Sequence, residues 1–392
     1  MMRSLSLKPT LIVAVAALAV ALIFVAPSSA EQLSTYGYNA GHLTQTKANR
    51  MVGGDANTVR IYVDWRRVEP TAPVSGVHDW HWRVFDNDLD YAANATDADH
   101  PSGLKVILEV IGAPGWAGGN DCISDPEPGE TAGCPELDAP GENDGLNHWP
   151  DWRNFVSAVV AHAEERHPGE LIGVEAWNEP NGRVGGGIDP IVYARLVLHT
   201  YNALKPTYPN LTIIMGGLVA GPSDWLDDPP YMGQAEYLAN VLYWFINNGY
   251  TGTDVKFDAI SNHPYPKTAE VPDAWNKTQD KIEELKSWRD VYDTFCSPLC
   301  GFHKPIWVTE VGVSSYDAEH PAQGWTKQDE ALQNVFNHID LETKVAICHT
   351  LNDNPAVKGV ATEIDSPADA FGTRTKTDVA KPSFVTLRDI WP

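Results

Sequence analysis

Basic residues are scarce in this sequence of 392 residues. It has 28 Lys and Arg against 52 Asp and Glu, which gives a formal net charge of −24 at pH 7. A field of this sign repels nucleic acid and anionic lipid surfaces. We therefore expect no nucleic-acid partner, and we expect neutral ligands rather than polyanions.

Several signatures of common enzyme classes are also absent. There is no G-x-G-x-x-G or Walker sequence and no G-x-S-x-G elbow. His162 and His167 are five residues apart, so they are not an H-E-x-x-H motif and do not share a helix face. Asp86, Asp88 and Asp90 are spaced like calcium ligands but lack the glycine of a calcium loop. We therefore expect neither a metal nor an organic cofactor.

A long apolar run occurs once, at the N-terminus. Leu11 to Pro27 is almost wholly apolar, follows Arg3 and Lys8, and is closed by small residues ending at Ala30. This pattern is typical of a signal peptide, although a single membrane anchor is the alternative because the run could nearly span a bilayer. We expect cleavage after Ala30, which removes two positive charges and leaves an exported chain 31–392 with a net charge of −26.

Cysteine is sparse as well, with five in the whole chain. In an exported protein cysteines are expected to pair. Cys122 and Cys134 lie in one loop and Cys296 and Cys300 in another, so two local disulfides are predicted. Cys348 is then left over on an expected helix, where a buried thiol is the simplest interpretation.

The rest of the chain alternates between short β-branched runs and amphipathic stretches. The expected strands are Tyr36–Ala40, Thr58–Asp64, Leu104–Val110, Ile172–Trp177, Thr212–Gly217, Phe257–Asn262, Ile306–Thr309 and Val357–Thr362. The expected helices are Trp80–Asn94, Trp152–His167, Pro190–Leu204, Glu236–Asn248, Asp273–Phe295, Gln328–Leu351 and Ser383–Ile390.

Eight strands that alternate with helices favour a parallel sheet closed into a single (β/α)8 TIM barrel, an α/β fold, over residues 31–392. A doubly wound open sheet is the alternative. Such sheets usually carry a glycine-rich phosphate turn after the first strand, which this sequence lacks. The one long insertion, Gly115 to Pro150, is rich in Gly, Pro and acidic residues.

Two carboxylates stand just past expected strands. Glu179 follows the fourth strand within Trp-Asn-Glu-Pro, and Glu310 follows the seventh within Val-Thr-Glu-Val-Gly. In a barrel these positions lie at the active face, on opposite sides of the mouth. Glycosidic cleavage needs such a pair, because one carboxyl protonates the leaving oxygen while the other attacks the anomeric carbon or activates water. Glu175 lies deeper on the fourth strand and is expected to be structural.

These segments resemble a known group of enzymes. Asn178-Glu179-Pro180 and Thr309-Glu310-Val311-Gly312 are similar to the acid/base and nucleophile motifs of glycoside hydrolase clan A, the retaining barrel glycosidases. Val59–Trp65, Ala113–Ala117 and Ser261–Pro266 extend the similarity over nearly all of the exported chain. They look more like family 39 (β-xylosidases and bacterial exopolysaccharide hydrolases) than family 5 cellulases.

The resemblance implies roles for individual residues. Glu179 would be the general acid/base and Glu310 the nucleophile. Asn178 would hold the sugar hydroxyl next to the anomeric carbon, and Arg60 would keep the nucleophile ionised. Tyr265 would donate to the same carboxylate, and His263 would contact the floor of the site or the substrate. Arg60 could instead pair only with Glu175, and His263 could be a core histidine.

Further substrate contacts are expected at other strand ends. Trp65 and Trp116 are candidate sugar platforms. Many clan members end the eighth strand with a Trp, but Gly359–Asp365 contains no aromatic residue. Glu363 or Asp365 is therefore expected to line the pocket and to favour a glycan other than cellulose, unless both point away from the mouth.

The sequence thus predicts a secreted, monomeric, retaining glycoside hydrolase that cleaves a neutral poly- or oligosaccharide. The carboxyl carbons of Glu179 and Glu310 are expected roughly 5–5.5 Å apart. The alternative is a non-catalytic carbohydrate-binding protein of the cell envelope on the same barrel. The presence of both carboxylates argues against it, because a decayed enzyme usually loses one.

Overall fold

The structure, a computed structural model, describes most of the chain that follows the N-terminal segment. The described residues are 34–119, 139–141, 144–182, 185–220, 232–266, 273–296, 298–313, 321–339, 343, 345–349, 373 and 380–391. The chain from Leu33 onward forms one compact unit. Within the described ranges, no helix has the length and apolar character that crossing a bilayer requires.

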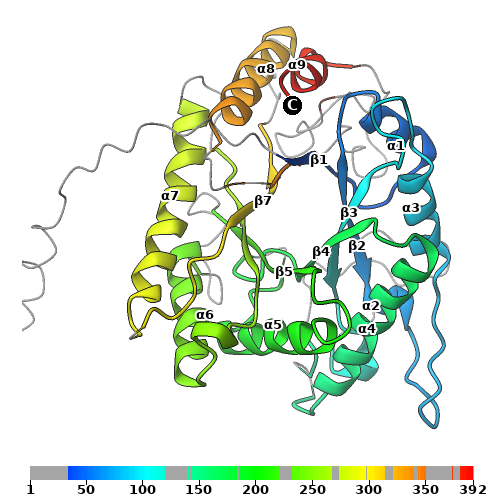
Figure 1. Cartoon of the computed structure of the whole chain (residues 1–392), viewed down its shortest axis with the longest axis vertical. Coiled ribbons are helices and arrows are strands. Elements are labelled where there is room, and N and C mark those ends of the chain that lie inside the picture. The colour runs from blue at the N-terminus through cyan, green and yellow to red at the C-terminus, as the bar shows by residue number, and fades with distance from the viewer. Residues whose placement is uncertain are drawn as a thin grey trace, which may run out of the picture. The chain divides into compact units, whose positions relative to one another are not determined.

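Eight parallel strands form a closed barrel in which each strand pairs with the next along the chain (Figure 1). The first and last strands close the ring, with Thr35 beside Val345 and Tyr38 beside Cys348. The strands are β1 (Thr35–Asn39), β2 (Thr58–Asp64), β3 (Lys105–Ile111), β4 (Leu171–Ala176), β5 (Thr212–Val219), β6 (Ala259–His263), β7 (Ile306–Val311) and β8 (Val345–Cys348).

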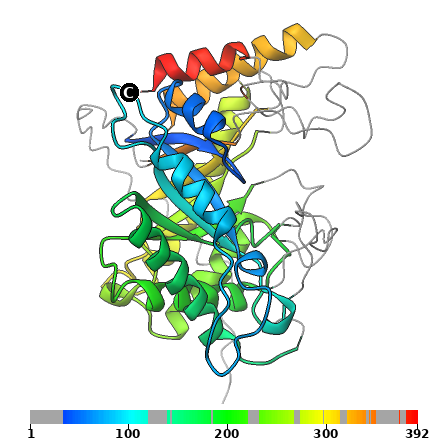
Figure 2. The same cartoon turned by 90° about the vertical axis from the view of Figure 1, so that its right-hand side faces the viewer.

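Helices surround the strands, and α8 and α9 lie side by side at one end of the molecule (Figures 1 and 2). This arrangement confirms the predicted (β/α)8 barrel. The α-helices are α1 (Gln45–Val52), α2 (Trp65–Val68), α3 (Arg83–Ala93), α4 (Trp149–Arg166), α5 (Pro190–Leu204), α6 (Gln234–Asn247), α7 (Asp273–Asp293), α8 (Pro321–His338) and α9 (Pro382–Ile390), and two 3₁₀ turns span Gly115–Ala117 and Gly252–Asp254.

The strands place an apolar layer and a polar layer inside the barrel. A cluster of buried apolar side chains comes from the strands alone: Ile107, Ile214, Ala259, Val345 and Ile347. Side chains two residues apart on a strand share a face, so Glu109 follows Ile107 on the inner face of β3. Gly173 allows the layer to close, because a Cβ there would lie 2.9 Å from a methyl carbon of Ile214. The charged layer therefore rests on a filled floor.

The predicted elements omit α1 and are wrong at the eighth strand. β8 is Val345–Cys348, not Val357–Thr362, and α8 ends at His338 instead of continuing to Leu351. A buried apolar run of four residues has no periodicity that separates strand from helix. Cys348 is buried, as expected, but it lies on a strand.

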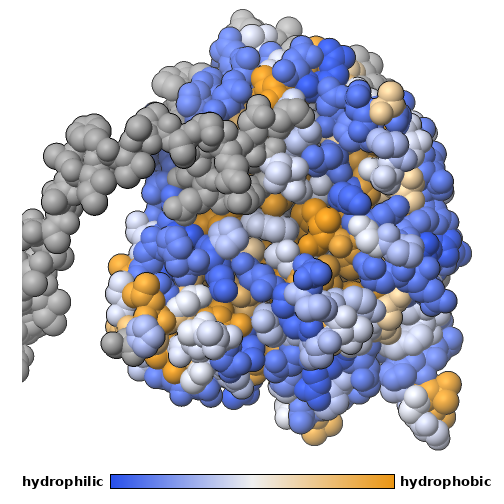
Figure 3. Space-filling model, viewed as in Figure 1, coloured by the Kyte–Doolittle hydropathy of each residue, from blue (hydrophilic) through white to orange (hydrophobic). Residues whose placement is uncertain are grey.

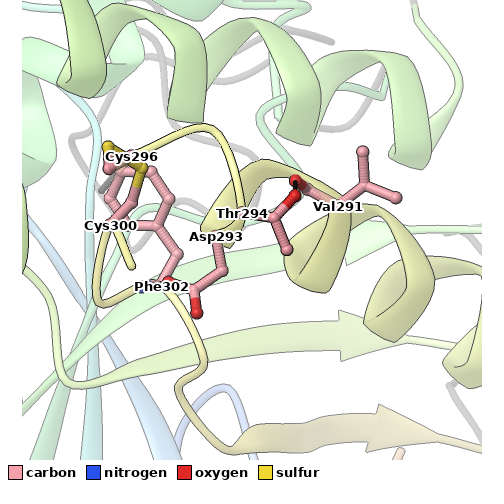
Figure 4. The surroundings of a disulfide bond; sticks show 6 residues. All are labelled: Val291, Asp293, Thr294, Cys296, Cys300 and Phe302. Carbon is pink, nitrogen blue, oxygen red and sulfur yellow. Dashed lines mark hydrogen bonds between the residues drawn. A yellow bond between two sulfur atoms is a disulfide. The ribbon is translucent and has the colours of Figure 1, made fainter. Parts of the chain in front are cut away.

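One of the two predicted disulfides lies in the described chain. Cys296 and Cys300 are bonded, with an S–S distance of 2.02 Å, at the C-terminal end of α7 (Figure 4). The main-chain N–H of Phe302 donates to Asp293 at 2.6 Å and fixes the same turn. The predicted pair Cys122 and Cys134 lies outside the described residues.

Candidate active site

Arg60 is the centre of the polar layer. Its guanidinium is fully buried and contacts carboxylates from three other strands. Nε donates to Glu175 at 2.6 Å, and Nη1 lies 2.7 Å from both Glu310 and Glu109. Nη2 donates to the side-chain oxygen of Asn178 at 3.0 Å. Arg60 therefore makes both of the pairings considered from the sequence, with Glu175 and with Glu310.

The carboxylates around Arg60 differ in their affinity for protons. Burial lowers the pKa of Arg60, but Glu109, Glu175 and Glu310 outweigh this and raise it, so the guanidinium is always charged. Burial also raises the pKa of Glu109 to about 7, against the opposing effect of Arg60. Glu109 is therefore partly protonated at neutral pH, which lowers the repulsion among the three carboxylates.

Glu310 stands at the end of β7 and accepts hydrogen bonds at both oxygens. Asn39 and Arg60 donate to Oε1 at 2.8 and 2.7 Å. The hydroxyl of Tyr265 donates to Oε2 at 2.6 Å, and Nδ1 of His349 lies 3.2 Å from the same oxygen. Residues from four other strands or strand ends thus hold this carboxylate in one position.

These contacts keep Glu310 ionised. Burial raises the pKa of the carboxyl, but His263, Arg60 and His349 together hold it well below its usual range. A carboxylate in this state is a base or nucleophile and not a proton donor. The same surroundings raise the pKa of Tyr265 well above its ordinary value, through burial first and the charge of Glu310 second, so its hydroxyl keeps its proton and stays a donor.

Glu179 lies across His263 from Glu310. Nδ1 of His263 is 2.9 Å from Oε1 of Glu179 and 3.7 Å from Oε2 of Glu310. One side-chain atom from each of these three residues lies within 4.8 Å of the other two. Burial lowers the pKa of His263, but Glu310 and Glu179 raise it above its ordinary value. The buried imidazole therefore links the two carboxylates electrostatically.

The position of His263 depends on its neighbours on β5 and β7. Nε2 lies 3.0 Å from the hydroxyl of Thr309, which in turn donates to Glu175 at 2.9 Å. Gly217 faces the ring, and a Cβ there would lie 2.0 Å from Nε2. Any side chain larger than that of glycine at position 217 would therefore collide with the ring of His263. A single sequence does not reveal this steric requirement.

The backbone that carries Glu179 is strained. Trp177 and Glu179 have φ values of 77° and 41°, the left-handed region that bulky side chains rarely adopt. The turn is held by the indole of Trp177, which donates to Gly185 at 3.0 Å, and by the N–H of Gly182, which donates to Glu179 at 2.8 Å. Strain of this kind persists where the surroundings enforce it, often at functional sites.

The aromatic residues proposed as sugar platforms differ in accessibility. Trp65 is fully buried and stacks on Phe155 at 5.2 Å between ring centroids, so the platform prediction is wrong for it. It begins α2 directly after Asp64, the N-cap, and this turn directs it into the core. Trp116 is partly exposed and its indole donates to the main chain of Glu69 at 2.9 Å; its role as a platform stays a prediction.

The residue that follows the eighth strand is His349. It contacts Glu310 and lies 2.6 Å from the hydroxyl of Tyr265. The prediction that Glu363 and Asp365 end this strand is wrong, because the strand ends at Cys348, and both residues lie outside the described part of the chain. The sequence analysis did not identify His349 and Asn39. Neither residue is in a recognisable motif, and each reaches Glu310 only because its strand lies near β7 in the closed barrel.

The same residues determine whether a metal could bind. Among the described residues, Glu179, His263 and Glu310 are the group whose ligand atoms could jointly hold an ion. Both oxygens of Glu310 already accept hydrogen bonds, and the guanidinium of Arg60 lies beside them. This donor set favours acid–base chemistry over chelation.

Comparisons with known proteins agree with the fold. No protein-family model and no curated protein sequence matches the chain. A monomeric β-xylosidase from Caulobacter crescentus matches with a TM-score of 0.61 and 16% identity over 91% of this chain and 67% of its own. A GH39 enzyme from Xanthomonas axonopodis matches with a TM-score of 0.57 and 15% identity over 92% of this chain and 66% of its own.

A shorter enzyme gives a match along nearly its whole length. An endo-β-1,4-glucanase from Xanthomonas axonopodis has a TM-score of 0.54 and 14% identity over 91% of this chain and 98% of its own. This chain therefore spans about two thirds of the longer relatives and almost all of the glucanase. At these identities the similarity shows a shared fold, the (β/α)8 barrel of structures described as glycosidases.

Proposed function

We propose that the protein is a retaining glycoside hydrolase in which Glu179 is the general acid/base and Glu310 the nucleophile. The observation that carries the proposal is the pair of facing carboxylates, with oxygen atoms within 4.8 Å of each other. Retaining enzymes have carboxyl groups about 5–5.5 Å apart, whereas inverting enzymes leave about 6.5–9.5 Å for a water molecule. An oxygen–oxygen distance within 4.8 Å fits the closer of these two spacings, which supports double displacement.

In the first step Glu310 attacks the anomeric carbon. The ionised carboxylate forms an ester bond to this carbon as the bond to the leaving oxygen breaks, and Glu179 gives its proton to that oxygen. Arg60 and Tyr265 hold Glu310 during the attack through hydrogen bonds of 2.7 and 2.6 Å. The nucleophile therefore enters the reaction already oriented.

In the second step Glu179 acts as a base. It takes a proton from a water molecule, whose oxygen attacks the anomeric carbon on the face that the leaving group vacated. The ester bond breaks, Glu310 leaves as a carboxylate, and the product keeps the configuration of the substrate. Glu179 regains the proton that it gave up, so the cycle closes without any other reactant.

Asn178 is positioned to bind the sugar hydroxyl next to the anomeric carbon. Its side-chain oxygen accepts from Arg60 at 3.0 Å, so its amide nitrogen is the group turned to other acceptors. A hydrogen bond to that hydroxyl strengthens as charge develops on the sugar ring. Asn178 therefore contributes to the transition state more than to initial binding.

The substrate class follows from the charge and from the end of β8. The net charge of −24 disfavours anionic glycans. His349 follows β8, the strand that many clan A enzymes end with a Trp. A histidine at this place offers a sugar a hydrogen-bonding group instead of a large stacking surface. We therefore propose a neutral glycan other than cellulose, cleaved outside the cell by a monomer whose signal peptide, residues 1–30, has been removed.

A panel of aryl glycosides and neutral polysaccharides tests this function, with the anomer of the first product followed by NMR. We expect hydrolysis in which the first product has the configuration of the substrate. A first product of inverted configuration would refute the assignment of Glu310 as nucleophile. Binding without any turnover would instead favour the non-catalytic carbohydrate-binding protein.

A further inference from the structure

A groove of about 760 Å³ lies between α6 and α7, which pack side by side (Figure 1). Its lining comes from the end of β5, from α6 and from α7, and includes neither Glu179 nor Glu310. We propose that this groove is a second glycan-binding site, which holds a neutral polysaccharide beside the barrel. The choice of a glycan as the ligand rests on the proposed function.

Trp288 supplies an aromatic surface on one wall. Its side chain is 41% exposed, although it belongs to a long helix whose other aromatic ring in the lining, Tyr292, is partly buried. The rings of Trp288 and Tyr292 are 6.2 Å apart and tilted by 30°, and Tyr292 stacks on Phe295 at 4.9 Å. Tyr292 thus packs between Trp288 and Phe295, and the three rings form a continuous aromatic surface.

The apolar surface continues along this end of α7. Val291, Phe295 and Leu299 are all more than half exposed, and Figure 3 shows hydrophobic surface gathered over the region where Figure 1 places the ends of α6 and α7. Trp288 and Val291 lie on the last two turns of α7, and Phe295 and Leu299 follow its end, so apolar side chains extend past the helix. The C–H faces of sugar rings pack on such surfaces as aromatic and aliphatic groups do.

Polar groups on the other parts of the wall are mainly hydrogen-bond acceptors. Glu236 and Asn240 lie one turn apart on α6, and the amide nitrogen of Asn240 donates to the main chain of Glu236 at 3.0 Å. The same nitrogen also donates to the sulfur of Met232 at 3.4 Å, so the acceptor that Asn240 offers is its side-chain oxygen. Glu284 adds a second carboxylate from α7, one oxygen of which accepts from Gln234 at 2.7 Å. Acceptors of this kind bind hydroxyl groups.

Charge excludes the main competing ligands. The lining holds two carboxylates and one lysine, Lys281, whose ammonium donates to the main-chain oxygen of Tyr265. An anionic glycan or a nucleic acid would meet uncompensated negative charge, whereas a neutral polyol would not. Because Tyr265 also donates to Glu310, Lys281 connects the lining of the groove to a residue that contacts the proposed nucleophile.

Affinity electrophoresis of the full chain tests the proposal. We would run E310Q, which cannot turn over substrate, through gels that contain soluble arabinoxylan, mixed-linkage β-glucan or glucomannan. At least one polymer should retard E310Q. Adding W288A should weaken binding, so that the apparent dissociation constant rises about tenfold. W288Y keeps a ring and should retain most of the binding. Polygalacturonate, a polyanion, should not retard any variant.

Tyr243 provides a matched control, because it is an aromatic residue on α6 that is 54% exposed and does not line the groove. Y243A should bind like its parent. Retardation by none of the three neutral polymers, or equal retardation of E310Q with and without W288A, would overturn the proposal. Aryl-glycoside hydrolysis by the wild type and by W288A should be equal. Its absence in both would refute the proposed function without changing the gel result.

Discussion

Glu310 and Glu179 are the same side chain at the ends of β7 and β4, but their surroundings differ. Glu310 is 7% exposed and receives hydrogen bonds from three donors besides the nearby imidazole of His349. Glu179 is 12% exposed, and its described contact is with His263, on a backbone in the left-handed region. One carboxylate is fixed as an anion, while the other is placed by its main chain.

In the proposed mechanism, this difference gives one residue type two roles in a single site. Donors and positive charge hold the carboxylate of Glu310 in the form that attacks. Substitutions of Glu310, Glu179 or their partners should therefore have different effects on activity, on stability and on the pH dependence of the reaction.

The largest effect is expected for Glu310→Gln. The amide keeps the size of the side chain but removes the nucleophile, so kcat on aryl glycosides should fall by about 10⁴-fold or more. Circular dichroism and thermal unfolding would show whether the barrel is retained. Activity above a tenth of the wild-type value would mean that Glu310 is not the nucleophile.

Glu179→Ala should depend on the leaving group. Substrates with poor leaving groups need protonation and should lose about 10²–10⁴-fold in rate, whereas a dinitrophenyl glycoside should lose far less in its first step. The ratio of the two losses is the measurement. Equal losses on both substrates would show that Glu179 does not protonate the leaving group.

Arg60→Met should destabilise the barrel. It leaves Glu109, Glu175 and Glu310 buried without their shared cation, which is expected to cost about 3–5 kcal/mol in the free energy of unfolding measured with urea. The matched control is Arg166→Met, which removes a surface pair with Asp90 and should cost less than about 1 kcal/mol. Similar losses in both variants would show that the buried cluster is not what Arg60 stabilises.

The smallest effect is expected for His349→Ala. His349 lowers the pKa of Glu310, so its removal should raise that pKa. Glu310 would then become protonated at a higher pH, and the acidic limb of kcat/KM should move upward by about one pH unit or less. His303→Ala, a change at an exposed histidine, is the control and should leave the limb in place.

Much of the site could be predicted from the sequence, because strand ends in a barrel converge wherever they occur along the chain. The strands that carry Glu179 and Glu310 were predicted within two residues of β4 and β7, and Arg60 lies within β2, whose limits were predicted as observed. His349 was not found, because β8 is four residues long and has no period of its own. Trp65 shows a second limit, since a helix of four residues turned it inward.

The cluster around Arg60 contains one guanidinium and three carboxylates, so acidic groups outnumber the basic one there. A resting sugar is neutral and gains little from this field. As the glycosidic bond breaks, positive charge spreads over the ring oxygen and the anomeric carbon. The same charges, already oriented, then attract the ring without any rearrangement. In the proposed mechanism, the barrel mouth therefore binds the positively charged transition state more tightly than the neutral substrate.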